Sequence, residues 1–294
     1  MTPILEVREL VKVYPKVKAV NGISFAIEAG CCFGLLGPNG AGKTTTIEMI
    51  EGIKTPTSGE ILYRGQPRTR HFKQEAGIQF QSTALMDFIT VEEILRLFAS
   101  FYPRALPVDA VVEMCDLGEF KNQYATRLSG GQKQRLLLGL ALIHDPEIVF
   151  LDEPTTGLDP QSRRRFWDLI NDIKARGKTV VLTTHYMEEA ERLCDRLVII
   201  DHGRIIEQGA PQELLRRHFG HVRVCLDRLT LTPEVEALPE PVSVTAEGVE
   251  ILSQSVEATL ARLIAAGVPL DSLRVRNPTL EDLFIKLTGH QLRE

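Results

Sequence analysis

The sequence lacks any apolar stretch long enough to cross a bilayer as a helix. Its most apolar run, LLLGLALI at residues 136–143, falls far short of the about 20 apolar residues that a membrane-spanning helix needs. The first residues, MTPILEVREL, place acidic side chains among the apolar ones, which does not fit a secretory signal peptide. We therefore expect a chain that does not span a membrane by itself.

Cysteine is sparse. The five cysteines are scattered along the chain, and none has the CxxC spacing of a zinc site or the pairing pattern of a disulfide framework. We expect reduced thiols, as in a cytosolic protein. The adjacent Cys31 and Cys32 are expected to enter a buried strand as two small apolar side chains, with a strained vicinal pair as the alternative.

Positive charge is not in excess either. The 34 Lys and Arg residues stand against 39 Asp and Glu residues, a net charge of −5. Nucleic-acid binders usually carry a basic face or stripe, so we expect no nucleic-acid partner. Hydrophobic residues at 44% and charged residues at 25% are ordinary for a soluble globular protein. The length suggests one large domain with room for a smaller appendage.

Strands alternate with helices through most of the chain. Residues 4–13 and 19–27 predict strands, and residues 32–36 (CFGLL) form a continuous apolar run that is typical of a buried parallel strand. This run leads into a glycine-rich turn and then a helix over 43–53. Such alternation predicts an α/β domain with a largely parallel sheet over residues 1–218.

The remaining predicted elements follow the same patterns. Within the first domain they are helices over 91–102, 105–115, 131–144, 163–176 and 187–194, and strands over 148–151, 180–183, 197–200 and 204–208. After Gly220 the character changes, to strands over 221–226, 242–246, 249–252 and 273–275 and helices over 256–266 and 279–288. We place a boundary near residues 218–220 and predict a small α+β domain over 219–294.

Residues 37–44, GPNGAGKT, match the pattern G-x-x-x-x-G-K-[ST] between a predicted strand and a predicted helix. The glycines allow the backbone to curl so that successive N–H groups point at phosphate oxygens, and the helix adds its positive N-terminal end. Lys43 supplies a cation for the β- and γ-phosphates, and the Thr44 hydroxyl is suited to bind Mg²⁺. The predicted phosphate-binding residues are Gly37, Pro38, Asn39, Gly40, Ala41, Gly42, Lys43, Thr44 and Thr45.

A second motif ends an apolar strand in two acids. Residues 148–153, IVFLDE, place Asp152 and Glu153 at the carboxyl end of that strand, the edge at which α/β sheets bind ligands. Asp152 is expected to hold Mg²⁺, directly or through water. Glu153 is expected to act on the attacking water as a general base or orienting group.

The sequence LSGGQ at residues 128–132 predicts a second anion site. Ser129 is a good N-cap residue, and Gly130 and Gly131 leave the first backbone N–H groups of the following helix uncovered; Gln132 completes the motif. One phosphate-binding loop is enough for one ATP. We therefore expect two copies of the chain to meet, each offering this motif to the ATP of the other.

Four motifs together resemble the ATP-binding cassette ATPases: GPNGAGKTTT at 37–46, LSGGQ at 128–132, FLDEPTTGLDP at 150–160 and TTH at 183–185. The resemblance covers about residues 1–218. It implies a P-loop cassette with a mostly parallel central sheet, an antiparallel β subdomain and a helical signature subdomain. It also implies ATP and Mg²⁺ as ligands, a head-to-tail dimer, and a separately encoded membrane permease on whose cytoplasmic side the protein works.

The resemblance also assigns roles to single residues. Tyr14 matches the aromatic residue that stacks on adenine, and His185 the histidine that contacts the γ-phosphate. Asp159 matches the aspartate that communicates between monomers. Gln81 matches the glutamine that senses Mg²⁺ and the attacking water, with Gln79 as the alternative, and Phe80 stands where the family often has proline. The segment after Gln81, STALMDFITVEEIL, is expected to form part of the groove for the permease.

The tail carries a narrower resemblance. Residues 277–289, NPTLEDLFIKLTG, resemble the ending of bacterial exporter ATPases of the daunorubicin-resistance (ABC-2) type. This favours an exporter and names no substrate. An importer ATPase, a lipid or polysaccharide exporter and a non-transport cassette remain as alternatives, although the segment between Lys43 and Ser129 lacks the heptad array of the DNA-repair relatives.

Overall fold

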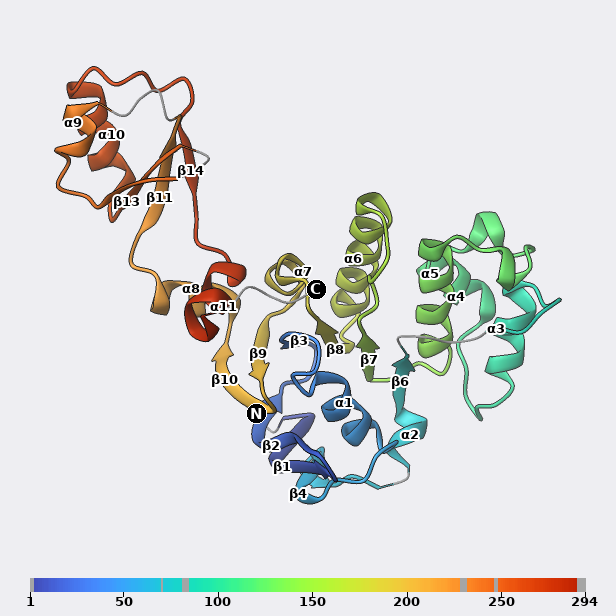
Figure 1. Cartoon of the computed structure of the whole chain (residues 1–294). Helices are drawn as coiled ribbons and strands as arrows, with labels where there is room; N and C mark the ends of the chain where they lie inside the picture. The colour runs from blue at the N-terminus through green and yellow to red at the C-terminus, as the bar shows by residue number, and fades with distance from the viewer. Residues whose placement is uncertain (1–2, 70, 81–84, 228–231, 246–247, 290–294) are drawn as a thin grey trace. The chain divides into compact units, whose positions relative to one another are not determined.

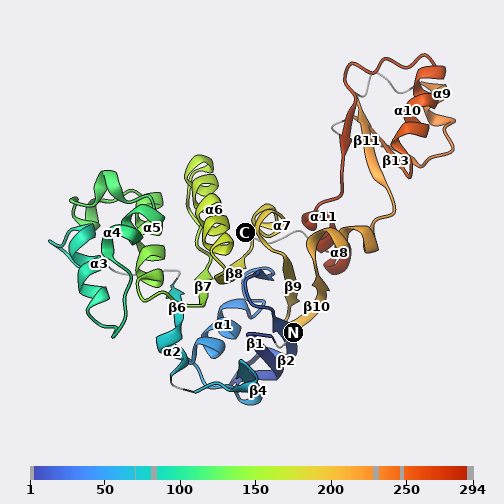
Figure 2. The same cartoon turned by 180° about the vertical axis from the view of Figure 1, so that it is seen from behind.

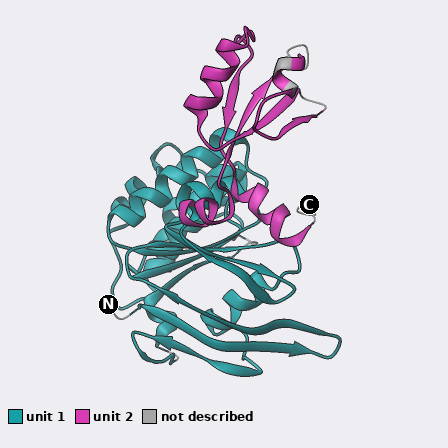
Figure 3. Cartoon of the chain, turned by 90° about the vertical axis from the view of Figure 1, so that its left-hand side faces the viewer, with its two compact units in different colours: residues 1–211, 292–294 teal, residues 212–291 magenta. Residues whose placement is uncertain are grey.

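The computed structural model describes residues 3–69, 71–80, 85–227, 232–245 and 248–289 (Figure 1). The chain divides into two compact units between Pro211 and Gln212 (Figure 3). The sequence pattern predicted a boundary seven residues later, so most of helix α8 (Pro211–His218) belongs to the second unit. None of the helices in the described part of the chain is long and apolar enough to cross a membrane.

A six-stranded sheet forms the centre of the first unit, in the order β10-β9-β3-β8-β7-β6. All neighbouring pairs are parallel except β10 with β9. Every residue of β3, β7 and β8 is buried, which fits the continuous apolar run of β3 and the apolar residues at the centres of β7 and β8. The strands are β3 (Cys32–Leu36), β6 (Ala76–Gln79), β7 (Ile148–Asp152), β8 (Thr179–Thr184), β9 (Arg196–Asp201) and β10 (Arg204–Gly209).

An antiparallel sheet of four strands lies in the same unit, in the order β2-β1-β4-β5. Side chains from both sheets share one hydrophobic core, in which Leu5 and Ile27 join Phe33 and Phe150. The strands are β1 (Leu5–Tyr14), β2 (Val17–Ile27), β4 (Ser58–Tyr63) and β5 (Gln66–Pro67), and helix α1 (Lys43–Glu51) and the short α2 (Phe72–Glu75) belong to this part of the unit.

Three helices form a separate group beyond β6 (Figures 1 and 2). They are α3 (Val91–Ala99), α4 (Val108–Met114) and α5 (Gly130–Leu142), and they contact one another, with short 3₁₀ turns at Gly118–Phe120 and Ala125–Arg127. Helix α5 packs tightly on β6, because a Cβ atom at Gly77 would lie 2.2 Å from the carbonyl oxygen of Ala141. Helices α6 (Pro160–Ala175) and α7 (Met187–Leu193) complete the unit.

The second unit contains a β-α-β-β-α-β run whose four strands pair antiparallel in the order β12-β13-β11-β14. This is the split βαβ arrangement. Its own small core includes Val224, Ile251 and Leu263. The elements are β11 (Val222–Leu226), α9 (Pro233–Glu236), β12 (Val242–Val244), β13 (Val249–Ser253), α10 (Val256–Ala265) and β14 (Arg274–Arg276), flanked by α8 and α11 (Leu280–Thr288). The observed architecture is the predicted cassette fold with an α+β appendage.

Candidate nucleotide site

The loop between β3 and α1 requires glycine at two of its positions. Gly37 and Gly42 have φ values of 152° and 108°, in the region that side-chain-bearing residues rarely adopt. A Cβ atom at Gly37 would lie 2.1 Å from the carbonyl oxygen of Ile200, and one at Gly42 would lie 2.4 Å from that of Ala19. Both the backbone conformation and the close packing against β2 and β9 therefore require glycine at these positions of GPNGAGKT.

This loop borders a cavity of about 490 Å³. The cavity brings together residues from the loop, from β1 and β2 and from the end of β7, which lie far apart in the sequence. Its lining is Tyr14, Val17, Ala19, Pro38, Asn39, Gly40, Gly42, Lys43, Thr44, Thr45 and Glu153. Ala41 belongs instead to the hydrophobic core.

The Lys43 amine lies at the base of this cavity. Its Nζ atom donates to the carbonyl oxygens of Gly37 at 2.8 Å and Pro38 at 3.3 Å, and it lies 3.5 Å from Oε1 of Glu153. Burial lowers the pKa of Lys43, and the negative charge of Glu153 opposes that shift. The loop carbonyls and Glu153 thus hold a buried cation beside the glycine loop.

Asp152 and Thr44 form a compact set of oxygen atoms. The Thr44 hydroxyl donates to Oδ1 of Asp152 at 3.5 Å, and burial raises the pKa of Asp152. Hydroxyl and carboxylate oxygens suit Mg²⁺, which is usually held by one or two protein groups together with substrate phosphates. The described residues contain no group of three or more His, Cys, Asp or Glu side chains that could hold a metal ion without such help. The residues present therefore fit Mg²⁺ bound jointly with phosphates.

Thr183 is a functional candidate that the sequence reasoning did not single out. Its hydroxyl donates to Oδ1 of Asp152 and accepts from the backbone N–H of Glu153 at 3.0 Å. One hydroxyl on β8 therefore orients both acids at the end of β7. A threonine inside the buried run VVLTT was the available signal, because a buried hydroxyl needs a partner.

Glu153 and His185 face each other across the ends of β7 and β8. Nδ1 of His185 lies 3.4 Å from Oε1 of Glu153, and Glu153 is only 8% exposed. Glu153 has a positive φ of 47°, a costly conformation for a residue with a side chain. Strained backbone of this kind clusters at functional sites, and here it occurs at the acid expected to act on water.

The LSGGQ residues cap helix α5. The Ser129 hydroxyl accepts from the N–H of Gln132 at 3.3 Å, while Oε1 of Gln132 accepts from the N–H of Ser129 at 2.9 Å. A Cβ atom at Gly131 would meet Oγ of Ser162 at 2.8 Å, so this glycine allows α5 to approach α6. Ser129 and Gly130 are exposed, and the described lining of the 490 Å³ cavity includes no residue of this motif.

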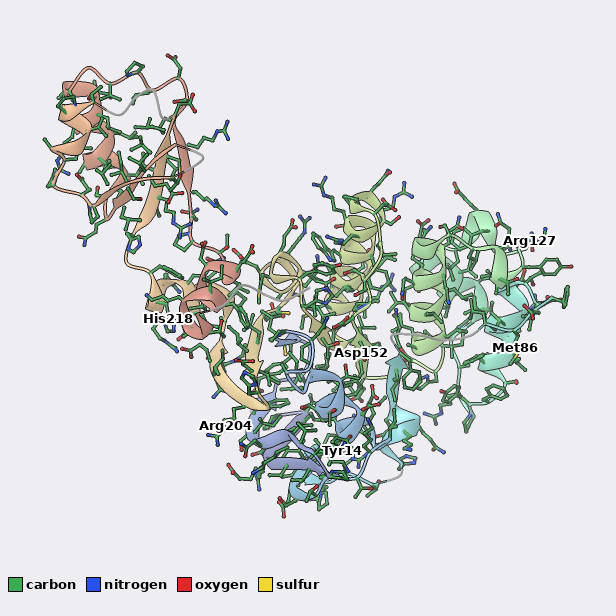
Figure 4. The ribbon with its side chains drawn as sticks, in the orientation of Figure 1. Tyr14, Met86, Arg127, Asp152, Arg204 and His218 are labelled. Carbon is green, nitrogen blue, oxygen red and sulfur yellow. The ribbon has the colours of Figure 1, made fainter. Side chains whose placement is uncertain are left out.

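Two further predicted residues have local partners. The Tyr14 ring lies 5.4 Å from Nζ of Lys12 and 5.8 Å from Nζ of Lys54, at the cavity wall (Figure 4). Asp159 is the N-cap of α6, where its Oδ1 accepts from the N–H groups of Gln161 and Ser162, both at 3.0 Å. Hydrogen bonding from the Ser162 side chain, followed by that from its N–H group, lowers the pKa of Asp159.

Gln81 lies outside the described residues, so the structure does not bear on its predicted role. The alternative residue, Gln79, is 2% exposed at the end of β6. Its amide donates to Oε1 of Gln134 on α5 at 2.5 Å. Gln79 therefore joins the central sheet to the helix that begins with LSGGQ.

Comparison with known proteins identifies the family to which this chain belongs. Residues 20–156 match the family model described as ABC transporter. The Nod factor export ATP-binding protein I of Burkholderia orbicola is 40% identical, over 99% of this chain and 98% of its own length. The protein of the same name from Cupriavidus metallidurans is 38% identical over the whole of both chains. The chain belongs to the ABC transporter ATPase family.

Solved structures agree with this assignment. The cbiO1 protein of Clostridium perfringens, described as part of the ABC transporter complex cbiONQ, is 29% identical with a TM-score of 0.68, over 74% of this chain and 92% of its own. An ATP-binding cassette in a dimeric post-hydrolysis state with ADP and Pi is 25% identical with a TM-score of 0.62, over 70% and 98%. This ABC protein is the ATP-binding, ATP-hydrolysing subunit of a transporter.

Proposed function

We propose that the chain powers export through a separately encoded membrane permease and works as a head-to-tail dimer at the cytoplasmic face of the membrane. Relatives that align over nearly their full length are named Nod factor export ATP-binding protein I. The tail at residues 277–289 resembles daunorubicin-resistance (ABC-2) exporter ATPases, which favours the same direction of transport. Full-length similarity to proteins named for export is the observation that carries this proposal.

The dimer follows from the separation of the two phosphate-binding elements. Lys43 and the glycine loop border the cavity, whereas Ser129 and Gly130 are exposed at the start of α5 and do not line it. The N-terminus of a helix favours an anion. A second copy brings its Ser129 to the nucleotide held by the first, so that two nucleotides are enclosed between two chains. The dimeric cassette with ADP and Pi supports this arrangement.

Hydrolysis relies on the groups around Glu153. Thr44 and Asp152 would hold Mg²⁺ with the phosphates, and the metal would neutralise phosphate charge. Lys43 supplies a second positive charge on the side of the glycine loop. Glu153 takes a proton from the attacking water, and His185, 3.4 Å from its carboxylate, contacts the γ-phosphate. Tyr14 stacks on the adenine, Gln81 senses the metal and the water, and Asp159 signals to the partner copy.

The permease is proposed to dock on an exposed apolar patch formed by Met86, Phe88 and Tyr124. Their exposed fractions are 51%, 86% and 40%, which is unusual for such large apolar side chains gathered together. The rings of Phe88 and Tyr124 lie 6.4 Å apart, and Phe88 has a positive φ of 57°. In Figure 4, the labels of Met86 and Arg127 show that the patch lies on the part of the unit that contains helices α3, α4 and α5. A cytoplasmic helix of the permease is the proposed occupant, because an amphipathic helix buries such a patch.

Two experiments test these proposals. We take Nod factor as the trial substrate, because the full-length relatives are named for its export. Inside-out membrane vesicles carrying the transporter should accumulate it when ATP is added; ATP-dependent loss of preloaded Nod factor from the same vesicles would contradict export. For docking, Phe88→Glu should release the chain from the membrane fraction. Phe101→Glu, at an aromatic residue that is 63% exposed outside the patch, is the matched control. Equal release of both variants would reject the patch as the docking site.

A further inference from the structure

Glu189 is a fully buried carboxylate that the proposed mechanism does not use. It lies on α7, four residues after His185, and is 0% exposed. Its Oε1 accepts from the Thr155 hydroxyl at 2.7 Å and from the indole N–H of Trp167 at 2.9 Å. Burying a carboxylate is costly unless it is hydrogen-bonded, and these two donors, both on Oε1, offset part of that cost.

The two donors come from different segments. Thr155 follows Glu153 by two residues in the loop after β7, and Trp167 lies on α6. Glu189 therefore ties α7 to the loop of the proposed catalytic acid and to a long helix beside it. Burial raises the pKa of Glu189, and hydrogen bonding from Thr184, Thr155 and Trp167 opposes that rise.

Arg163 on α6 strengthens the same connection. Its Nη2 donates to the carbonyl oxygen of Leu158 at 3.3 Å, and its guanidinium lies 4.5 Å from the ring centroid of Tyr186. Helix α6 thus contacts both the loop after Glu153 and the residue next to His185. The spacing between these two loops is set by buried polar contacts as well as by apolar packing.

We propose that Glu189 is a positioning residue for ATP hydrolysis: its carboxylate anchors α7 to Thr155 and Trp167, and so fixes His185 relative to Glu153. The inference rests on the roles proposed above for Glu153 and His185. Glu189 does not touch the cavity and takes no part in proton transfer. When the hydrogen bonds of Glu189 are weakened, His185 is no longer held in place relative to Glu153. ATP turnover then falls, whereas nucleotide binding stays intact.

The first test compares two substitutions at Thr155, made in the full chain. Thr155→Val keeps the shape but removes the hydroxyl that Glu189 accepts, whereas Thr155→Ser keeps the hydroxyl. We expect kcat for ATP to fall about tenfold or more in Thr155→Val, since small misplacements of catalytic groups have effects of this size. The KM for ATP stays within about twofold, and Thr155→Ser recovers most of the turnover.

The second test changes the carboxylate itself. Glu189→Gln removes the charge and weakens both hydrogen bonds, so it should lower kcat in the same manner. Glu188→Gln, an identical change at the exposed neighbour on the same helix, should have no effect. The combined Thr155→Val and Glu189→Gln variant should lose little more than either single variant, because both changes break one link.

Tryptophan fluorescence shows whether the link itself has changed. Trp167 is the only tryptophan in the chain, so its emission reports directly on the indole that donates to Glu189. Glu189→Gln should shift this emission while thermal unfolding stays cooperative, and Glu188→Gln should leave it unaltered. If Glu189→Gln does not fold, the Thr155→Val and Thr155→Ser pair decides.

Loss of nucleotide affinity in Thr155→Val and Glu189→Gln with an unchanged kcat would overturn the inference and leave Glu189 as a core residue. Equal turnover of Thr155→Val and Thr155→Ser would do the same. The assignment of Glu153 is tested separately by Glu153→Gln. If Glu153→Gln retains turnover, the proposed mechanism fails; if it loses turnover while Glu189→Gln does not, this inference alone fails.

Discussion

Nδ1 of His185 lies 3.4 Å from Oε1 of Glu153, although 31 residues separate them in the chain. Each follows a buried strand, and β7 and β8 are parallel neighbours in the sheet. Their carboxyl ends therefore meet at one edge, where Thr183 also orients Asp152 and Glu153. Sheet topology thus brings the acid, the histidine and the glycine loop after β3 to one place.

Removing the cation at the glycine loop should abolish hydrolysis. Lys43→Ala deletes the amine that lies between the loop carbonyls and Glu153. The described lining of the cavity then keeps no Lys or Arg to stabilise phosphate charge. The measurement is ATPase turnover of the purified variant. Lys178→Ala, which removes a partly buried ion-pair partner of Asp145, is the control and should hydrolyse ATP normally. Near-normal turnover in Lys43→Ala would refute the assignment of the loop.

The adenine contact predicts a difference between two substitutions at Tyr14. Base–aromatic stacking contributes about 1–3 kcal/mol in nucleic-acid systems, so Tyr14→Ala should weaken ATP binding by roughly tenfold or more. Tyr14→Phe keeps the ring and should be nearly silent. Equilibrium binding of a fluorescent ATP analogue measures both. Equal losses would show that the hydroxyl, not the ring, makes the contact.

Glu51 gives the protein a pH-dependent stability. It is 3% exposed on α1, and burial, followed by the charges of Asp152 and Glu48, raises its pKa from 4.5 to about 8. Between these values the folded chain holds a proton that the unfolded chain has released. The free energy of unfolding therefore falls as pH rises, by at most about 1.4 kcal/mol per pH unit from this group.

The variant Glu51→Gln lacks this titration. Its stability should exceed that of the wild type near neutral pH, and the advantage should shrink as the pH falls toward 4.5. Urea unfolding without nucleotide, measured at several pH values across this range, checks the prediction. Glu188→Gln, a change at an exposed acid on α7 whose charge is not among the causes of the Glu51 shift, is the control. Parallel pH profiles for wild type and Glu51→Gln would contradict the account.

The appendage should be dispensable for nucleotide binding. The described cavity lining comes only from the first unit, so a chain truncated near residue 220 should still bind ATP. We predict instead that the appendage serves assembly or regulation. If the truncated protein is soluble but fails to bind ATP, the appendage is needed for nucleotide binding and the prediction is wrong.

Strong local patterns were enough to predict most of the fold. The continuous apolar run at 32–36 coincides with β3, and the motif-bearing helices begin within a few residues of their predicted starts. The strands Ser58–Tyr63 and Ala76–Gln79 were not predicted. The first begins with three exposed residues and the second has only four residues including a glycine, so neither shows a clear period along the sequence.

Residues defined by tertiary contacts were harder to predict. Motif spacing drew attention to Lys43, Asp152 and Glu153, and the structure brings them together. Motif spacing gave no reason to choose Thr183 or Glu189. Their importance depends on hydrogen bonds to segments about 30 residues away in the chain. The role of a buried polar residue depends on its hydrogen-bond partners in the folded chain, and the residues next to it in the sequence do not reveal those partners.

The most direct test of the central claim separates ATP binding from hydrolysis. Glu153→Gln keeps the shape of the side chain but removes the basicity that activates water. ATP that is bound but not hydrolysed should then hold two copies together, since a ligand that binds the dimer more tightly than the single chain raises the dimer population. Adding Ser129→Arg should prevent association, because a bulky cation would occupy the exposed start of α5 that is proposed to meet the partner's nucleotide.

The measurement is light scattering of Glu153→Gln with and without ATP over micromolar protein concentrations, repeated with the reconstituted transporter. The account predicts an ATP-dependent doubling of mass for the Glu153→Gln chain, which the added Ser129→Arg change abolishes. In the transporter it predicts stable retention of ATP with the same dependence on Ser129. If ATP leaves Glu153→Gln unassociated in both samples, or if Ser129→Arg makes no difference, the two-copy mechanism is contradicted.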